Sequence, residues 1–144
     1  KNSIGQITWK TNMPLIAAAH DIPYVATACP SYPFDLMDKV AKAAAIEGPA
    51  YVHIFSVCPT GWGSGTEMGI EIGKLAVQTG IFPLFEVENG KYKMNVNPSK
   101  RKPVEEYLKP QRRFRHLSPE DINLIQEKTD KEYEKLLELV EKSK

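Results

Sequence analysis

Helical and extended sequence patterns alternate between residues 14 and 96, and this alternation constrains the fold more than any other feature. Proline or glycine separates the units, as at Ile22-Pro23 and Gly48-Pro49. Residues 15–20 have the pattern of a helix end, and residues 24–29 have that of a strand. Strands that alternate with helices are typical of layered α/β folds. We therefore predict the α/β class with a mostly parallel sheet.

The next segment predicts an amphipathic helix that begins near Pro33 and ends before Gly48. Apolar side chains recur at helical spacing and are expected to face the core. They are Phe34, Met37, Val40, Ala41, Ala44 and Ala45. The charged side chains are expected to face water. They are Asp35, Asp38, Lys39 and Lys42.

Residues 51–57 form a nearly continuous apolar run, which predicts a strand that is covered on both faces. Cys58-Pro59 ends it, and a glycine-rich loop over residues 60–65 follows. A helix is then expected from Thr66 to Thr79. Its predicted inner face carries Met68, Ile72, Leu75 and Ala76. Asn89-Gly90 lies between two extended runs and predicts a hairpin that finishes the sheet.

Residues 97–116 are rich in Pro, Lys and Arg, and we interpret them as a basic arm rather than a core element. Ser118-Pro119 then opens an amphipathic C-terminal helix. Its apolar stripe is expected to pack on this chain's own sheet or on a partner. The stripe comprises Ile122, Ile125, Tyr133, Leu136, Leu137 and Val140. We thus divide the chain into an α/β part, residues 1–96, and an arm with a helix, residues 97–144.

Composition excludes several classes of protein. A length of 144 residues suits one domain, and a net charge of +1 argues against nucleic-acid binding through overall basicity. No apolar run approaches the roughly 18 to 20 residues of a membrane span, and Lys1–Gln6 lacks the apolar stretch of a signal peptide. From these two features we expect a cytoplasmic protein. Two cysteines are too few for a disulfide scaffold, and we expect them to be core residues, ligands or redox groups. The first residue is not Met, which suggests a processed or partial chain.

Cys58 is the main candidate for a ligand, because open α/β sheets bind ligands beyond the carboxyl ends of their strands. On position alone, a small buried hydrophobic residue is the alternative. An iron-sulfur cluster usually needs four thiolates, and two cysteines cannot complete one. His20 and His53 are poor candidates for a general base, because His53 lies within an apolar strand and His20 adjoins a turn.

Several segments closely resemble the C-terminal half of the β subunits of pyruvate:ferredoxin oxidoreductases, in the 2-oxoacid:ferredoxin oxidoreductase family. The resemblance runs over residues 5–120, and Cys58-Pro59-Thr60-Gly61-Trp62 is its most specific part. The other matching segments are residues 13–20, 22–28, 48–54 and 84–90. This resemblance implies the C-terminal half of a thiamine-pyrophosphate-binding fold.

The resemblance also implies cofactors. Subunits of this family hold thiamine pyrophosphate, Mg²⁺ and a 4Fe-4S cluster, and the Cys of the Cys-Pro-Thr-Gly-Trp motif is a cluster ligand; it matches Cys58. The other three cysteines and the Gly-Asp-Gly motif that binds Mg²⁺ and diphosphate are missing from this chain. We therefore expect a split or truncated β subunit that binds neither thiamine pyrophosphate nor Mg²⁺ and is inactive alone.

Four further residues are expected beside the cluster rather than on it: Cys29, Thr60, Gly61 and Trp62. Cys29 stands where the family more often has Ser, so a buried thiol is its main interpretation. Trp62 and its glycines either cover the cluster or form a flexible loop with one anchoring aromatic residue. The basic arm either steers an acidic ferredoxin, lies against a partner subunit, or is a solvated linker.

The implied activity is oxidative decarboxylation of pyruvate, or a related 2-oxoacid, with coenzyme A to acyl-CoA and CO₂, with electrons passing through 4Fe-4S clusters to ferredoxin. The implied partners are the N-terminal half of the subunit, other subunits of a heteromultimeric oxidoreductase of anaerobic metabolism, and ferredoxin. We expect no nucleic acid or membrane. Two alternatives stay open: a non-catalytic α/β assembly module, and a thiamine-dependent decarboxylase or synthase without electron transfer. The sequence does not distinguish among the 2-oxoacids.

Overall fold

The computed structural model describes residues 9–144. The features expected of Lys1–Gln6, and the first eight residues of the α/β part, lie outside the described residues. Within them, the strands are β1 (Tyr24–Ala28), β2 (Ala50–Ile54), β3 (Leu84–Glu88) and β4 (Lys91–Val96). The helices are α1 (Met13–Ala19), α2 (Pro33–Ala45), α3 (Pro59–Trp62), α4 (Gly69–Gln78), α5 (Val104–Leu108) and α6 (Pro119–Lys142), with 3₁₀ turns at Thr66–Met68 and Arg112–Phe114.

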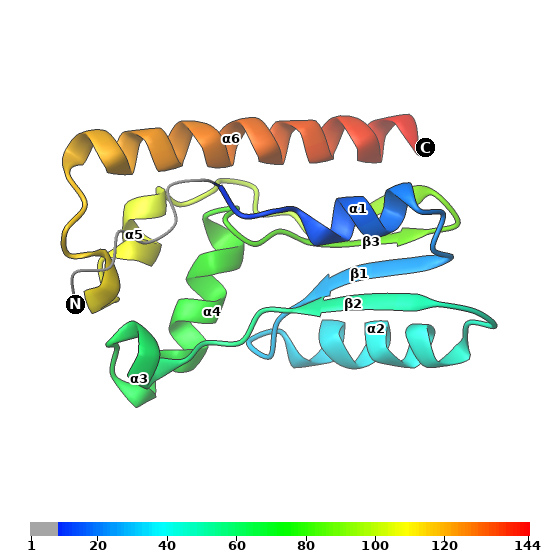
Figure 1. Ribbon diagram of the computed structural model, residues 1–144, viewed down its shortest axis with the longest axis horizontal. Coiled ribbons are helices and arrows are strands. Elements are labelled where there is room, and N and C mark those ends of the chain that lie inside the picture. Colours follow the sequence, from blue (N-terminus) through cyan, green and yellow to red (C-terminus); the bar gives the residue numbers. More distant parts are fainter. Residues whose placement is uncertain (1–8) are drawn as a thin grey trace.

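The four strands form one sheet in the order β2-β1-β3-β4. β1 pairs with β2 in parallel, so that Tyr24 lies opposite Ala50, while β3 pairs with β1 and with β4 in antiparallel fashion. α2 covers one face of the sheet, and α1 and α6 cover the other (Figure 1). The expected α/β class, with a terminal hairpin and a C-terminal helix, is confirmed, and the sheet is mixed.

Local signals place the hairpin and the last helix as predicted. Asn89 and Gly90 both have positive φ, at 48° and 78°, as a type I′ turn requires. Ser118 Oγ accepts a hydrogen bond from the N–H of Asp121 at 3.2 Å, and the Asp121 carboxylate accepts one from the N–H of Ser118 at 2.9 Å. This reciprocal capping box begins α6. None of the helices within residues 9–144 combines the length and apolarity needed to cross a membrane.

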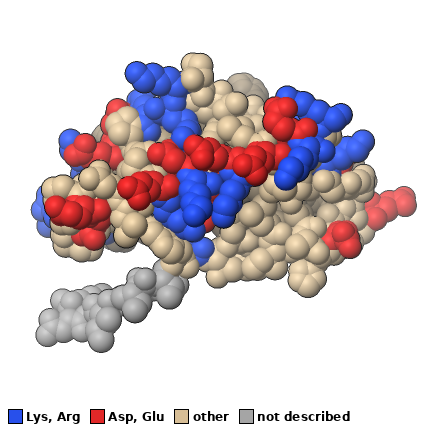
Figure 2. All heavy atoms as spheres, turned by 90° about the horizontal axis from the view of Figure 1, so that it is seen from above, with Lys and Arg blue, Asp and Glu red and all other residues tan. Residues whose placement is uncertain are grey.

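α6 packs on this chain's own sheet. Tyr133 and Leu136 are buried, and Leu136 contacts the cluster formed by α1, β1 and β3. On the face of the molecule along which α6 runs, Lys and Arg alternate with Asp and Glu (Figure 2). One such pair joins Lys128 to Glu132, with Nζ and Oε1 2.7 Å apart. The outer side of α6 is therefore a solvated face.

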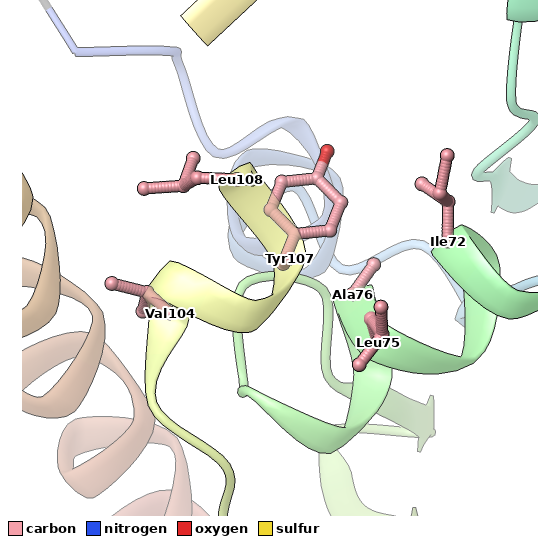
Figure 3. Packing of buried hydrophobic residues seen from close by; sticks show 6 residues of the cluster. All are labelled: Ile72, Leu75, Ala76, Val104, Tyr107 and Leu108. Atoms are coloured by element: carbon pink, nitrogen blue, oxygen red, sulfur yellow. The ribbon is translucent and has the colours of Figure 1, made fainter. Parts of the chain in front are cut away.

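The basic segment makes core contacts that the sequence did not indicate. Val104, Tyr107 and Leu108 of α5 are buried against Ile72, Leu75 and Ala76 of α4 (Figure 3). The predicted inner face of α4 is thus confirmed, and Met68 packs at the margin of the same cluster. The expectation that residues 97–116 contribute nothing to the core is wrong, because three apolar residues among many basic ones suffice to build one buried helical turn.

α2 lies with its apolar stripe toward solvent, contrary to prediction. Phe34, Met37 and Val40 are 80%, 64% and 47% exposed, whereas Lys39 is only 1% exposed. The Lys39 ammonium donates to Asp35 at 2.8 Å and to the carbonyl of Thr27 at 2.9 Å. The physical reason lies in the sheet: the buried carboxylate of Glu86 requires a cation, and α2 supplies Lys42, with Nζ 2.8 Å from Oε1.

β2 also differs from its prediction. The strand covers residues 50–54, so it begins one residue before the expected range of 51–57 and ends three residues before the end of that range. It lies at the edge of the sheet. Its side chains are exposed or half-buried, and Ile54 is 47% exposed. The apolar run predicted a strand covered on both faces, but none of the side chains of β2 is fully buried.

Candidate functional site

The candidate site is built around Cys58, which lies four residues beyond Ile54 and is exposed. The N–H of Phe55 donates to the carbonyl of Ala28 at 2.8 Å and holds the chain where it leaves β2. Cys58 is the N-cap residue of α3, with φ −110° and ψ 90°, and its carbonyl accepts a hydrogen bond from the N–H of Trp62 at 2.9 Å. The segment that was expected to be a loop therefore begins with a helical turn, which fixes the Cys58 backbone.

Close contacts explain why glycine occupies two positions of this segment. A Cβ at Gly61 would lie 3.0 Å from the Cys58 Sγ, so any side chain there would crowd the sulfur. Gly63 ends α3 with φ 65°, in the left-handed region, and a Cβ there would lie 2.8 Å from the Cβ of Arg112. The first glycine leaves space beside the thiol, and the second allows close contact with the segment around Arg112.

Trp62 anchors the Cys58 segment to the body of the chain. Its ring centroid lies 5.6 Å from that of Phe55. The guanidinium carbon of Arg113 lies 3.8 Å from the centroid of the Trp62 ring, a cation–π contact. Hydrogen bonds from the N–H of Trp62 to the Cys58 carbonyl and from the N–H of Ser64 to the Pro59 carbonyl order the turn around it.

Arg113 is itself held by side chains of the α5 region. Its Nη2 donates to the hydroxyl of Tyr107 at 3.1 Å, and its Nε donates to the Gln111 Oε1 at 3.0 Å. Burial lowers the pKa of Arg113, while the contact with Tyr107 opposes this shift; burial raises the pKa of Tyr107. Sequence reasoning assigned Arg113 to a basic arm and missed its contact with Trp62. The two residues are distant in the sequence, and no local pattern links them.

Cys29 occupies a different environment from Cys58. It is 1% exposed, in an apolar cluster with Val77 and Leu84. A Cβ at Gly73 of α4 would lie 3.1 Å from its sulfur, so α4 packs closely on this thiol. The structure therefore places Cys29 inside the core and Cys58 at the surface, although each follows an extended run and precedes a proline.

The histidines lie outside this segment. The His53 ring packs edge-on against Phe82, with centroids 5.7 Å apart, and its Nδ1 lies 3.4 Å from the Tyr51 hydroxyl. Burial, followed by the charge of Lys10, lowers the pKa of His53. His20 caps the C-terminus of α1 through its backbone N–H and is exposed.

A second cluster of polar groups lies between α2 and the sheet. Glu86 Oε2 accepts a hydrogen bond from the Tyr24 hydroxyl at 2.9 Å, and Lys93 Nζ lies 3.2 Å from Oε1. Burial alone would raise the pKa of Glu86, but hydrogen bonds from Lys42, Tyr24 and Lys93 lower it to about 2. Burial and the adjacent carboxylate raise the pKa of Tyr24. The hydroxyl and the two ammonium groups satisfy the charge and the hydrogen-bonding capacity of the Glu86 carboxylate, and we therefore interpret the cluster as a structural network.

The residues that could hold a metal are few. Within residues 9–144, no group of three or more His, Cys, Asp or Glu side chains converges as metal ligands would. Cys58 supplies one exposed sulfur with open space beside it, which fits a single ligand of a shared cluster and not a complete site. Thr60 and Gly61 are exposed in the same turn.

Comparison with known proteins gives close similarity over most of the chain. The pyruvate synthase subunit PorB of Methanocaldococcus jannaschii is 59% identical over 121 residues, which are 84% of this chain and 41% of that subunit. The PorB subunit of Methanothermobacter marburgensis is 54% identical over 130 residues, covering 90% of this chain and 45% of the relative. The ketoisovalerate oxidoreductase subunit VorB of Pyrococcus furiosus is 52% identical over 128 residues, covering 88% and 41%. No family model matches the chain.

These comparisons confirm the resemblance expected from the motifs: the chain resembles part of a PorB subunit. The chain spans less than half the length of these curated relatives. Both sets of relatives are named as subunits of enzymes that act on 2-oxoacids.

Proposed function

We propose that this chain is part of the β subunit of a 2-oxoacid:ferredoxin oxidoreductase, to which it contributes Cys58 as one ligand of a 4Fe-4S cluster. The similarity to PorB and VorB subunits, up to 59% identity, carries the first half of this proposal. The exposed thiol of Cys58, at the head of the Cys-Pro-Thr-Gly-Trp turn, supports the second half. We place the complex in the cytoplasm.

The environment of Cys58 suits a thiolate ligand. A cluster sulfur must be anionic and fixed in direction. The hydrogen bond from Trp62 to the Cys58 carbonyl and the contact of Trp62 with Arg113 fix the turn, and Gly61 leaves the sulfur accessible. Within residues 9–144, no group of three or more His, Cys, Asp or Glu side chains converges as metal ligands would, and we expect the remaining ligands from the rest of the subunit.

The proposed reaction converts pyruvate or a related 2-oxoacid, with coenzyme A and oxidised ferredoxin, to acyl-CoA, CO₂ and reduced ferredoxin. Thiamine pyrophosphate, when bound with Mg²⁺ in the complete subunit, supplies the carbanion chemistry, while the protein supplies orientation and electrostatics. This chain's share is to place a cluster ligand. Pyruvate is the preferred substrate because the PorB subunit of M. jannaschii, at 59% identity, is more similar to this chain than the VorB subunits, at 51% to 52%. The VorB relatives make branched-chain 2-oxoacids the alternative.

The decisive experiment replaces each thiol in the complete complex and measures iron, sulfide and the paramagnetic signal after dithionite reduction. Cys58→Ala should remove one 4Fe-4S cluster and sharply reduce ferredoxin reduction, while thiamine binding is retained. Cys29→Ser is the matched control and should leave the iron content unchanged, because Cys29 is buried among apolar residues.

Three results would count against the proposal. Normal iron in Cys58→Ala would remove the ligand assignment, and equal iron loss in both variants would mean that the ligand set is different. A native complex without iron would support the non-catalytic assembly module. Thiamine-dependent decarboxylation without a paramagnetic signal would support the decarboxylase or synthase.

A further inference from the structure

The exposed side of α2 is an apolar surface. Phe34, Met37 and Val40 are 80%, 64% and 47% exposed and recur along one side of the helix. Three alanines continue this stripe and are also exposed: Ala41, Ala44 and Ala45. A helix usually turns such a stripe toward a packing partner. Within the described residues, nothing buries it.

The neighbouring strand has an open edge. β2 pairs with β1 on one side only, so the backbone groups of its other side have no strand partner within residues 9–144. Exposed edges normally carry charge or proline, which oppose pairing with other chains. Residues 50–57 contain neither. A continuous apolar run of this kind is typical of a strand inside a parallel sheet.

The opposite edge of the sheet shows the contrast. β4 carries Lys91 and Lys93, and the N–H of Tyr92 donates to the Oγ of Ser143, the residue after the end of α6, at 3.0 Å. Charge and a covering helix end therefore protect this edge. The β4 edge is thus protected from pairing with another strand, and the β2 edge is not.

The two apolar features belong to neighbouring elements, because α2 packs on both β1 and β2 (Figure 1). Ile54, which is 47% exposed, ends β2 at the same end of the sheet from which β1 leads into Phe34. We call the outer edge of β2 together with Phe34, Met37 and Val40 the β2–α2 face. An uncharged strand edge beside an exposed apolar helix stripe is the arrangement expected of a layered domain that continues beyond its last strand.

We propose that the β2–α2 face is the docking surface for the part of the subunit that lies outside this chain, which adds a parallel strand beside β2 and covers the apolar stripe of α2. This inference rests on the proposed function. The length of the relatives supports this occupant: the matched regions are only 41% to 45% of the PorB subunits, so more than half of such a subunit is available to fill the face.

The test co-expresses the full 144-residue chain with a tagged segment of the M. jannaschii PorB subunit that comprises the residues outside the matched region. The two chains should co-purify in a 1:1 complex, and backbone amides of residues 50–54 should exchange more slowly than in the chain alone. Met37→Glu should weaken the complex by about 30-fold, because it places a charge in an apolar interface. Leu124→Glu is the control, since Leu124 is 56% exposed on α6, across the sheet from α2.

Three outcomes would overturn the proposal: equal losses in Met37→Glu and Leu124→Glu, co-purification without protection of β2, and a homodimer of this chain that the added segment does not displace. Circular dichroism of both variants excludes misfolding as a cause. Adding the Cys58→Ser variant distinguishes a failure of this inference from a failure of the proposed function. Docking that survives in Cys58→Ser supports the interface whatever its iron content, whereas unchanged iron in that variant contradicts the ligand assignment alone.

Discussion

Arg113 has its effect through contacts rather than through free charge. It lies over the Trp62 ring at 3.8 Å and donates to Tyr107 and Gln111, so one side chain ties the Cys58 turn to the α5 region. A half-buried cation–π contact contributes about 1 to 2 kcal/mol. Arg113 is therefore a positioning residue for the turn that carries Cys58.

Arg113→Ala should loosen the turn without unfolding the chain. We expect the amides of residues 59–64 to exchange roughly tenfold faster, because the turn opens more often when this contact is lost. Arg115→Ala is the control, since Arg115 is exposed. Hydrogen exchange by mass spectrometry measures the difference. Equal exchange in the two variants would show that the contact does not hold the turn.

Glu86 links protonation to stability. Its pKa of about 2 is below the ordinary value of 4.5, so its ionised form stabilises the fold. That contribution is complete above pH 4.5 and is lost as the pH falls toward about 2. Glu86→Gln should lower the free energy of unfolding at pH 7 by roughly 1.5 to 3 kcal/mol, because a buried charged acceptor is lost.

Acid and thermal unfolding followed by circular dichroism would check this prediction. The variant should lose less stability than the wild type between pH 4.5 and pH 2, because it has no carboxylate to protonate at this position. Glu88→Gln, at the exposed end of β3, is the control and should change little. A parallel acid response in Glu86→Gln and wild type would contradict the assignment.

At the scale of elements, the predictable features have local causes. Asn89-Gly90 specified the hairpin, and Ser118 with Asp121 specified the start of α6, because turn and capping chemistry depend on a few adjacent residues. The orientation of α2 was not predictable from its pattern. A helical stripe shows that one side is apolar, but it does not say whether its partner belongs to the same chain.

The candidate site also combines features that a local motif predicts with features that depend on distant residues. Cys58 was proposed as a ligand from its motif, and the structure adds an exposed thiol at the head of a helical turn. The contact of Trp62 with Arg113 was not predictable, because it joins segments that are distant in the sequence. Core residues in the basic segment were missed for a related reason: Val104, Tyr107 and Leu108 are too few to produce a clear helical pattern.

The basic segment offers a test of electrostatic steering, now restricted to its exposed residues. Arg112 and Arg115 are exposed, whereas Arg113 is held against Trp62. In the complete complex, replacing both exposed residues with Gln should slow ferredoxin reduction several-fold at low ionic strength, because long-range attraction accelerates association. Stopped-flow rates at low and high salt measure this. A loss of equal size at high salt would indicate a structural role, because salt screens such attraction.

For the whole molecule, the missing motifs set a limit on cofactor binding. Hard Mg²⁺ prefers carboxylate and amide oxygens, and residues 9–144 bring no cluster of acidic or histidine ligands together. Calorimetric titration of the isolated chain with thiamine pyrophosphate and Mg²⁺ should therefore show no micromolar site. The co-expressed complex is the positive control. A micromolar site in the chain alone would contradict the view that it is one part of a larger subunit.

The isolated chain should also associate, because the β2–α2 face exposes apolar side chains to water. Sedimentation velocity should show dimers at micromolar concentration, and Met37→Glu should shift them toward monomers. A monodisperse, cooperatively unfolding wild-type monomer would contradict this expectation.

The protected β4 edge determines what kind of assembly this can be. A sheet with two open edges can recruit copies at both sides and grow into a filament. Here Lys91, Lys93 and the bond from Tyr92 to Ser143 protect one edge, so within residues 9–144 the β2 edge is the one open to pairing. Two free chains that join through it use identical surfaces, and their pairing leaves no open edge of the described sheet for a third. We therefore expect self-association through this edge to stop at two copies.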